Sequence, residues 1–446
     1  MFATVAGLLY IVKYLGGTSN PIKRVHDDSW LKTLRSISAR IRAEFSFMRG
    51  NLLTLIASWL FVFFTFSLVF SFESPFFREL GAPPFVIGLM GSAGAATLGL
   101  VRIPGAYMTD KYGRKQIIVT MTFLIAFSYV FYVFALDWRF VLIGMVISNL
   151  SLIYQPALDA ILADSIPPEK RGMGYAATNV IPNIPTVFAP ALAGYLVEIY
   201  GIVPGMRIVY TIVFFCLLAA AIIRLFFLKE TLKDPQKIRL AEVKAAFRNS
   251  LQAILEAWRD MSASLKFLTL AFLVSAFEDP TFRMFTSLYV FDVIGLGKLE
   301  WGLANTASIA ATLAFGFPMG KLVDKIGRKK SIVFANLIFI SATVAFLMAG
   351  TLHHLIVVFF MFAIGGSLLG PAYSALLADM IPREKRGRVM GTIVTLNILA
   401  TVPASALAGL LYGASPLYPF TFVVLLAIIV TLIIFLAVRE PKTREV

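Results

Sequence analysis

Residues 110–115 read D-K-Y-G-R-K, and residues 324–329 read D-K-I-G-R-K. A longer stretch repeats in the same way: A-D-S-I-P-P-E-K-R-G at residues 163–172 returns as A-D-M-I-P-R-E-K-R-G at residues 378–387. The two pairs of copies are separated by almost the same number of residues, so they are in register. Self-similarity at a fixed spacing is typical of a repeated structural unit. The sequence therefore predicts two half-chains that are copies of each other.

The composition indicates a membrane protein. The chain has 446 residues, of which 59% are hydrophobic and 15% are charged, and its mean hydropathy is +0.82. Average soluble proteins are about 45–50% apolar and about 25% charged. Two ordinary soluble domains could not bury so many apolar residues, which excludes a cytosolic enzyme, a disordered chain and a fibrous one. Cys216 is the only cysteine, which excludes a disulfide scaffold.

Twelve apolar stretches are long enough to span a bilayer as helices, since a spanning helix needs roughly 20 residues. They lie at about 52–76, 84–108, 116–136, 138–162, 173–200, 206–228, 265–292, 300–322, 331–350, 352–377, 389–412 and 416–438. The predicted fold class is an all-α integral membrane protein with twelve transmembrane helices in two six-helix bundles. Because six is even, both bundles enter the membrane from the same side.

The predicted organisation has five parts. They are a cytoplasmic N-terminal segment (1–50), an N-terminal bundle (51–228), a cytoplasmic linker (229–264), a C-terminal bundle (265–438) and a cytoplasmic tail (439–446). Apolar residues at helical spacing among basic ones over 30–48 predict a helix that lies on the membrane surface. The linker has a similar pattern, which indicates either a solvated helix with one apolar face or a partner-binding helix.

The distribution of positive charge predicts the orientation. Most of the 40 Lys and Arg residues fall before the first span, after the even-numbered spans or in the tail. The positive-inside rule then places both termini in the cytoplasm of a multi-pass plasma-membrane protein. We expect the net charge of +15 to lie at the cytoplasmic face and to attract anionic lipid headgroups rather than nucleic acid.

With its duplicated motifs after the second and fourth spans of each half, the chain resembles the major facilitator superfamily of secondary transporters over about residues 50–440. In that family the loop after the second span is a cytoplasmic latch, and its Asp faces a neighbouring helix N-terminus, where a carboxylate is favoured. The alternative is that these charges only fix the topology. The resemblance implies latch residues Asp110, Gly113 and Arg114, their counterparts Asp324, Gly327 and Arg328, and the pairs Asp164–Arg171 and Asp379–Arg386.

Three ionisable residues lie near the middle of the seventh span: Glu278, Asp279 and Arg283. None has a charged counterpart in the first half, so the fold does not require them. An ionisable residue at a helix centre costs roughly 2.5–3.5 kcal/mol on insertion scales, which makes a functional role the default hypothesis. On a regular helix Ser275, Asp279, Arg283 and Thr286 share one face, and we expect that face to line the central cavity.

Glu278 has no partner on such a helix, and a desolvated carboxylate without a partner holds a proton more readily. We expect Glu278 or Asp279 to be the proton-coupling acid, with Arg283 as its charge partner or as the anchor for an anionic substrate group. The alternative is a tolerated Asp279–Arg283 pair. Asn179 and Asn183, in the proline-rich fifth span, are further cavity candidates, because proline frees carbonyls that tolerate burial only beside a partner or a cavity.

Four other charged residues lie within spans or near their ends. Arg102 and Asp159 are predicted to form a buried pair, which is either structural or part of a proton path. Glu73, near the outer end of the first span, is either a gate residue or an interfacial acid. Arg224 is expected to snorkel to the membrane interface, because it lies close to the end of its span.

These features predict a secondary active transporter that moves a small molecule by alternating access, coupled to protons. Aromatic-rich spans with few charges favour efflux of amphipathic, drug-like compounds, whereas Arg283 favours proton-coupled uptake of a sugar or organic anion. A membrane receptor or enzyme on the same scaffold is an alternative of another class, but no catalytic cluster, metal motif or cofactor motif is visible in the sequence. The expected partners of a monomer are its substrate, protons and membrane lipids, with no nucleic acid.

Overall fold

Eleven helices among the described residues are long and apolar enough to cross a membrane. The computed structural model describes residues 47–111, 113–232, 252 and 254–440. The predicted surface helix over 30–48 and most of the predicted linker helix therefore fall outside the described residues.

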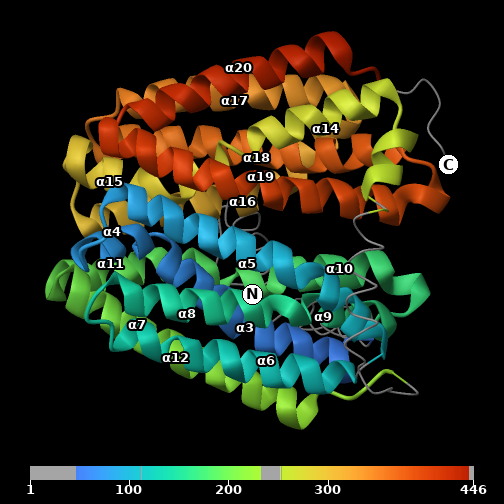
Figure 1. Cartoon of the computed structure of the whole chain (residues 1–446), viewed down its shortest axis with the longest axis horizontal. Helices are drawn as coiled ribbons and strands as arrows, with labels where there is room; N and C mark the ends of the chain where they lie inside the picture. Colours follow the sequence, from blue (N-terminus) through green and yellow to red (C-terminus); the bar gives the residue numbers. More distant parts are fainter. Residues whose placement is uncertain (1–46, 112, 233–251, 253, 441–446) are drawn as a thin grey trace, which may run out of the picture.

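The helices form two bundles that lie side by side (Figure 1). The N-terminal bundle contains α3 Gly50–Phe70, α4 Glu73–Glu79, α5 Pro84–Lys111, α6 Arg114–Ser128, α7 Val130–Val133, α8 Trp138–Ser151, α9 Gln155–Ser165, α10 Arg171–Val180, α11 Ala189–Tyr200 and α12 Ile202–Phe227. The C-terminal bundle contains α14 Ala263–Ser275, α15 Thr286–Tyr289, α16 Lys298–Ile326, α17 Arg328–Leu347, α18 Leu352–Met380, α19 Arg386–Ala414 and α20 Tyr418–Ala437. This is the predicted all-α architecture.

Among the described residues, the seventh predicted span is the one that does not form a helix long enough to cross a membrane. α14 has only 13 residues, and the chain then turns at 276–278. It is helical again from residue 279, through π-helical η6 Thr281–Phe285, the single turn of α15 and π-helical η7 Val290–Ile294. Pro280 has no N–H to continue the α-helical ladder. The residues before it instead make tighter bonds, with Phe277 N donating to Val274 O and Glu278 N to Ser275 O.

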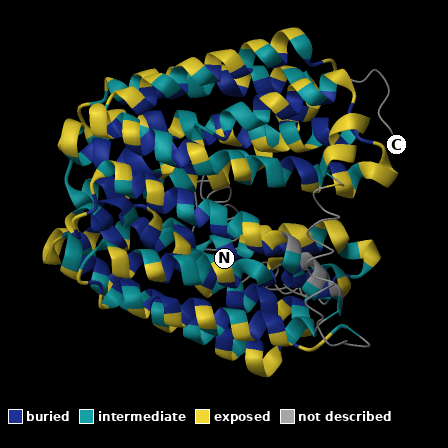
Figure 2. Cartoon of the chain, in the orientation of Figure 1, coloured by how far each residue is buried: buried dark blue, intermediate teal, exposed yellow. Residues whose placement is uncertain are grey.

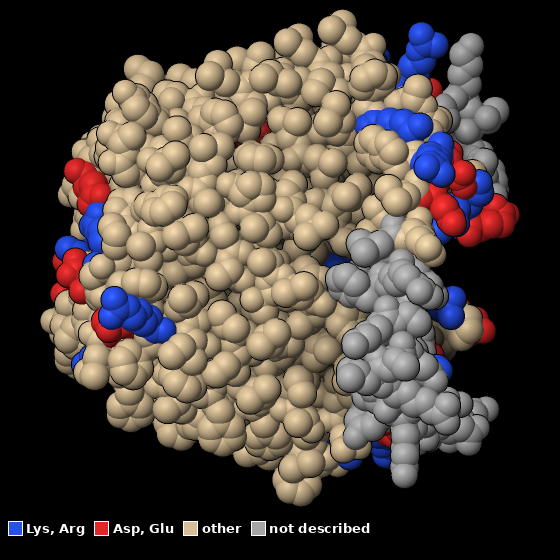
Figure 3. All heavy atoms as spheres, in the orientation of Figure 1, with Lys and Arg blue, Asp and Glu red and all other residues tan. Residues whose placement is uncertain are grey.

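Charged residues gather at the two ends of the molecule, and a wide band between them carries few (Figure 3). Exposed residues alternate with buried ones along the outer helices, as expected where apolar side chains face lipid (Figure 2). We call the end that carries the loops at 110–115, 163–172, 324–329 and 378–387 the motif side. The other end is called the opposite side.

The bundles touch closely toward the opposite side, where glycines let two helix backbones meet. A Cβ on Gly88 of α5 would lie 2.5 Å from Ser405 O, and one on Gly409 of α19 would lie 2.6 Å from Pro84 O. A Cβ on Gly194 of α11 would lie 2.8 Å from Lys298 O at the start of α16. Only glycine permits such close crossings.

Hydrogen bonds reinforce this closed end. Arg78 on α4 forms an ion pair with Asp292, and Trp301 Nε1 donates to Ser71 O at 2.7 Å. Glu198 accepts from Lys298 N at 2.9 Å. Among the described residues other than Lys111, hydrogen bonds between the bundles lie only here and at mid-depth, where Ser92 Oγ donates to Val402 O.

The motif side is open between the bundles. No hydrogen bond or ion pair joins the two bundles there among the described residues other than Lys111. Arg102 on α5 is exposed. The structure is therefore closed on the opposite side and open on the motif side.

Candidate functional site

The break in the seventh span carries the residues that sequence analysis selected. Ser275 ends α14, Glu278 ends the turn at 276–278, Asp279 begins the helical segment after it, and Arg283 lies in η6. The single helix face predicted from regular α-helical spacing is wrong, because the helix is interrupted between Ser275 and Thr286. The prediction that these residues share a cavity does not need that regularity, and the structure places Ser275, Asp279, Arg283 and Thr286 along one cavity.

That cavity has a volume of about 710 Å³ and extends into the C-terminal bundle; we call it the C-bundle cavity. Its walls are rich in aromatic rings, with a smaller number of amide, hydroxyl and carboxyl groups. The aromatic lining residues are Phe70, Phe272, Phe282, Trp301, Phe339, Phe359, Phe362 and Tyr373. Apolar walls with a few convergent polar groups are typical of small-molecule sites.

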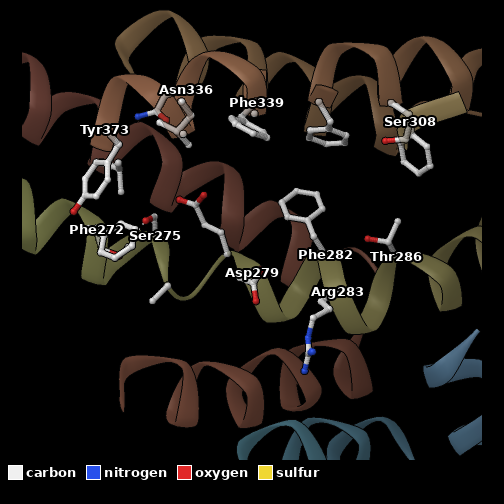
Figure 4. A pocket seen from close by; sticks show the side chains of 18 of the residues that line it. Phe272, Ser275, Asp279, Phe282, Arg283, Thr286, Ser308, Asn336, Phe339 and Tyr373 are labelled. Atoms are coloured by element: carbon white, nitrogen blue, oxygen red, sulfur yellow. Dashed lines mark hydrogen bonds between the residues drawn. The ribbon is translucent and has the colours of Figure 1, made fainter. Parts of the chain in front are cut away.

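Several polar atoms in this cavity have no hydrogen-bond partner among the described residues. Glu278 Oε1 is buried and unpartnered, and so are Asn336 Nδ2, Tyr373 Oη and Thr286 Oγ1. Figure 4 shows Asn336, Phe339 and Tyr373 on one side of the seventh span. Buried polar groups are normally hydrogen-bonded, so this grouping marks a place where a ligand, water or proton can bind.

A second cavity of about 370 Å³ lies between the two bundles; we call it the interface cavity. Asp279 and Arg283 line both cavities, while Glu278 lines only the C-bundle cavity. In Figure 4, Asp279 and Arg283 point away from Asn336 and Tyr373. The neighbouring residues Glu278 and Asp279 thus differ in position: Glu278 lines the C-bundle cavity alone, and Asp279 lines both cavities.

The ionisable residues of these cavities form no ion pairs with one another in the described part of the chain. The tolerated Asp279–Arg283 pair considered from the sequence is absent, since no N–O distance between them is within 4.0 Å. Glu73 lines the interface cavity, where it faces the charge of Arg283 from the other bundle. The sequence left Glu73 as a gate or interfacial residue, and its place in a cavity was missed.

Asn179 and Asn183 line neither of these two cavities. Asn179 Nδ2 donates to Tyr175 O at 3.0 Å, and Asn183 Nδ2 donates to Asn179 O at 2.6 Å. The fifth span is broken by short 3-10 turns that begin at Pro182 and Pro185, which frees backbone carbonyls. The two amides bond to carbonyls of their own span, so the structure does not place them with the seventh-span residues.

The predicted pairings around the motif loops are wrong in their partners. Asp164 forms its ion pair with Arg114, not with Arg171, and Asp379 lies 3.3 Å from Arg328 Nε. Arg386 donates to the Ala378 carbonyl at 2.7 Å. Each Arg of the first motif therefore binds the Asp of the second motif within the same bundle. In each bundle an ion pair therefore joins the two motif loops, which their spacing in the sequence does not reveal.

The helix starts in these loops are bonded by glutamates that the sequence analysis missed. Glu230 accepts from Lys115 N at 2.9 Å, and Glu440 accepts from Arg328 N at 3.2 Å. A carboxylate is favoured at a helix N-terminus, which is the role predicted for the motif Asp. Asp324 is instead exposed, and the side chain of Asp110 is outside the described residues. The signal was available, because Lys229-Glu230 after the sixth span repeats as Arg439-Glu440 after the twelfth.

The two motif glycines are needed for different reasons. Gly327 has φ +96°, a left-handed conformation that favours glycine. Gly113 has an ordinary φ, but a Cβ there would lie 3.1 Å from Glu230 Oε2. Gly113 thus leaves room for the capping glutamate Glu230, and Gly327 permits the turn.

Two other sequence predictions are overturned. Arg102 and Asp159 form no ion pair, and both are exposed rather than buried, so each charge can be solvated without the other. Arg224 does not snorkel to the interface, since its side chain is fully buried. Its guanidinium donates to Ser58 Oγ at 3.0 Å and to Thr122 Oγ1 at 2.8 Å.

The described end of the linker is held on the C-terminal bundle. Residues 254–260 are helical, and Asp260 pairs with Lys385 at 2.9 Å and with Arg388 at 3.0 Å. The hydrogen bond from Lys385 lowers the pKa of Asp260 below its ordinary value of 3.8. Glu256 adds a second contact to Arg388 at 3.2 Å. This charge cluster fixes the linker at the start of α19.

Comparisons with known proteins agree with this architecture. A family model described as Major Facilitator Superfamily matches residues 54–304 and 268–446. The chain is 27% identical over 336 residues to the multi-drug resistance efflux pump PmrA of Streptococcus pneumoniae, which covers 72% of this chain and 79% of that protein. It is 25% identical over 320 residues to multidrug resistance protein 2 of Bacillus subtilis, covering 70% of this chain and 76% of that protein.

A solved structure has the same fold. It is a crystal structure of a bacterial homologue of the human lysosomal transporter Spinster in an inward-facing, unoccupied conformation. It aligns with a TM-score of 0.68 at 17% identity and covers 87% of this chain and 96% of that one. At this identity the likeness concerns the fold alone.

Proposed function

Because the chain belongs to the Major Facilitator Superfamily and is a multi-pass membrane transporter of small molecules, we propose that it exports amphipathic compounds in exchange for protons. The observation that carries the proposal is the unpartnered, buried Glu278 Oε1 inside a cavity lined with aromatic rings. The aromatic walls suit an amphipathic substrate, and the carboxyl group suits a proton. Two curated relatives are named for multidrug resistance, which supports the same substrate class.

The orientation in this proposal follows the positive charges. The motif side, which carries the basic loops, faces the cytoplasm of the plasma membrane, and both termini lie there. The open motif side and closed opposite side then correspond to an inward-facing state. In this state a substrate enters the cavities from the cytoplasm. Export requires the opposite side to open while the motif side closes. The protein works as a monomer, and its basic face contacts anionic lipid headgroups.

Glu278 is the proton carrier of this proposal, and Asp279 is the second candidate. A charged carboxylate without a partner in a low-dielectric cavity is costly, so a proton is favoured there whenever no other cation is near. Next to the break at 276–278, Glu278 lines the C-bundle cavity while Asp279 lines the interface cavity as well. Substrate and proton can therefore occupy neighbouring positions along the seventh span.

The test uses the purified protein in proteoliposomes that contain a pH-sensitive dye. A panel of amphipathic compounds is added, and proton movement and compound flux are recorded together. Wild-type protein should move protons in the direction opposite to the compound. Glu278→Gln should abolish the proton signal, and Asp279→Asn is compared beside it. If both variants move protons as the wild type does, the coupling assignment is wrong.

Uptake of a sugar or organic anion together with protons is the second candidate. It is favoured by Arg283, whose guanidinium lines both cavities and forms no ion pair with Glu73, Asp279 or any other described acid. The same vesicles separate the two functions, because symport moves protons and substrate in the same direction. Absence of flux for every compound would instead favour a receptor or enzyme built on this scaffold.

A further inference from the structure

The interface cavity contains two acids and one base that do not neutralise each other directly. Glu73 comes from the N-terminal bundle, while Asp279 and Arg283 come from the broken seventh span. Glu73 and Arg283 are close enough for their charges to attract, yet no N–O distance between them is within 4.0 Å. Neither the Glu73 carboxylate nor the Arg283 guanidinium forms a hydrogen bond or ion pair with another described residue. The space that separates the two charges is the cavity itself.

Charges in such a place need partners. Arg283 and Asp279 are exposed within the cavity, whereas Glu73 is partly buried. A molecule that enters the cavity displaces the water around these charges, so it must supply a counter-charge or hydrogen bonds in place of that hydration. The remaining polar groups of the lining are uncharged hydroxyls and one amide, so none of them supplies a counter-charge; they belong to Tyr129, Tyr132, Ser148, Asn149, Thr401 and Ser405. A bound molecule is therefore the natural partner for both Glu73 and Arg283.

The arrangement selects against a ligand that carries charge of only one sign. A simple cation attracted to Glu73 is repelled by Arg283, and a simple anion attracted to Arg283 is repelled by Glu73 and Asp279. A molecule with both charges satisfies both residues and adds no net charge to the cavity. Arginine also binds carboxylates through two parallel hydrogen bonds, which a single charge on lysine does not reproduce.

The body of such a molecule has a place beside its charged end. Asp279 and Arg283 line both cavities, so the interface cavity and the aromatic C-bundle cavity adjoin at these residues. A charged end held between Glu73 and Arg283 can therefore continue as an aromatic body toward Phe282 and Phe70.

We propose that the interface cavity binds the charged end of an amphipathic zwitterion, with its carboxylate on Arg283 and its ammonium group on Glu73. This inference rests on the proposed transport function, because it assigns the substrate class of the same site. It does not depend on the direction of transport or on proton coupling.

The test uses three matched fluorescent probes. ε-Dansyl-lysine is a zwitterion with an aromatic body, its methyl ester carries only the ammonium group, and its α-N-acetyl derivative carries only the carboxylate. Binding to the purified full-length protein in lipid nanodiscs is measured by dansyl fluorescence at about pH 6, where the amine of the ester is protonated. The zwitterion should bind about tenfold more tightly than either derivative, since a charge-assisted hydrogen bond contributes roughly that factor.

The variants should give a crossed pattern. Arg283→Gln should weaken the zwitterion and the acetyl derivative about tenfold and leave the ester unchanged or improved. Glu73→Gln should weaken the zwitterion and the ester and spare the acetyl derivative. Arg283→Lys, which keeps the charge, should restore part of the binding. Arg102→Gln and Glu79→Gln are matched controls, because their side chains are exposed and line neither cavity.

The outcomes separate this inference from the proposed function. Equal binding of the three probes, or equal loss of all three in both variants, overturns the zwitterion site. If other amphipathic compounds still move protons in vesicles, the proposed function survives that result. If the crossed pattern appears but no compound moves protons, the binding site stands and the coupling proposal fails.

Discussion

Gly409 offers a direct test of how the closed end is held. Replacing it with alanine adds one methyl group where a Cβ would lie 2.6 Å from Pro84 O and 2.9 Å from Gly88 Cα. Both neighbours are backbone atoms, so they cannot move aside by changing a rotamer. The bundles must separate locally by about 0.8 Å to reach an ordinary contact of 3.4 Å.

The expected cost is that of overpacking, about 1–3 kcal/mol, and it falls only on the conformation in which the opposite side is closed. A bias of this size corresponds to a shift of about 5- to 150-fold in the equilibrium between open and closed ends. Gly409→Ala should therefore move the protein toward the state that is closed on the motif side. Gly413→Ala is the matched control one turn further along α19, because a Cβ there has no neighbour within 4 Å.

The assay is thiol labelling of a single reporter cysteine. Cys216→Ser removes the native thiol, and Gly320→Cys places a new one in the open space on the motif side. Labelling by a membrane-impermeant reagent should slow several-fold in Gly409→Ala and remain unchanged in Gly413→Ala. Unchanged labelling in Gly409→Ala, with a normal melting temperature, would refute the reasoning that this crossing holds the opposite side closed.

Three further predictions follow from contacts away from the cavities. Arg114→Ala should slow transport at unchanged substrate affinity, because it removes the ion pair to Asp164, whereas Arg171→Ala should alter neither; initial rates and binding check both variants. Arg224→Met should leave the melting temperature unchanged or raised, since a buried guanidinium bonded only to hydroxyls is costly to desolvate; a large loss of thermal stability contradicts this. The pKa of Asp260 is depressed in the folded protein, so its stabilising contribution is present above pH 3.8 and is lost as the pH falls through the folded-state value. The protection of residues 254–260 against hydrogen exchange, relative to the intrinsic rate at each pH, should therefore persist until the pH is below about 4.

The sequence predicts the fold well because the membrane leaves few alternatives. Long apolar stretches must be helices, and the duplicated motifs set their grouping. The sequence does not predict the interruption of the seventh span, which depends on local backbone conformation. Residues 276–280 combine two acids with a proline, and the hydrophobic periodicity does not determine whether a helix bends, unwinds or ends there.

The candidate site is predicted in part for a similar reason. Ionisable residues in the middle of a membrane span identify Glu278, Asp279 and Arg283 as candidates. Their position in the sequence does not reveal which of the two cavities each residue lines. The same argument leaves Glu73 open as a gate residue or an interfacial acid, because the sequence places it near a span end, where acids are common. Partners such as Arg114 and Asp164 are far apart in sequence, so spacing within a loop favours the wrong nearby arginine.

The glycine crossings have a mechanical consequence. Gly88 against Gly409 and Gly194 beside the start of α16 are two separate points at which the bundles touch backbone to backbone. The two contacts define a line between the bundles. The bundles can rotate about this line, whereas sliding along it or twisting across it would break the contacts. Rotation about the line through these two points is the relative motion that keeps both contacts, and a small displacement near this axis becomes a large one at the far end of each long helix. Under such a rotation one side opens as the other closes.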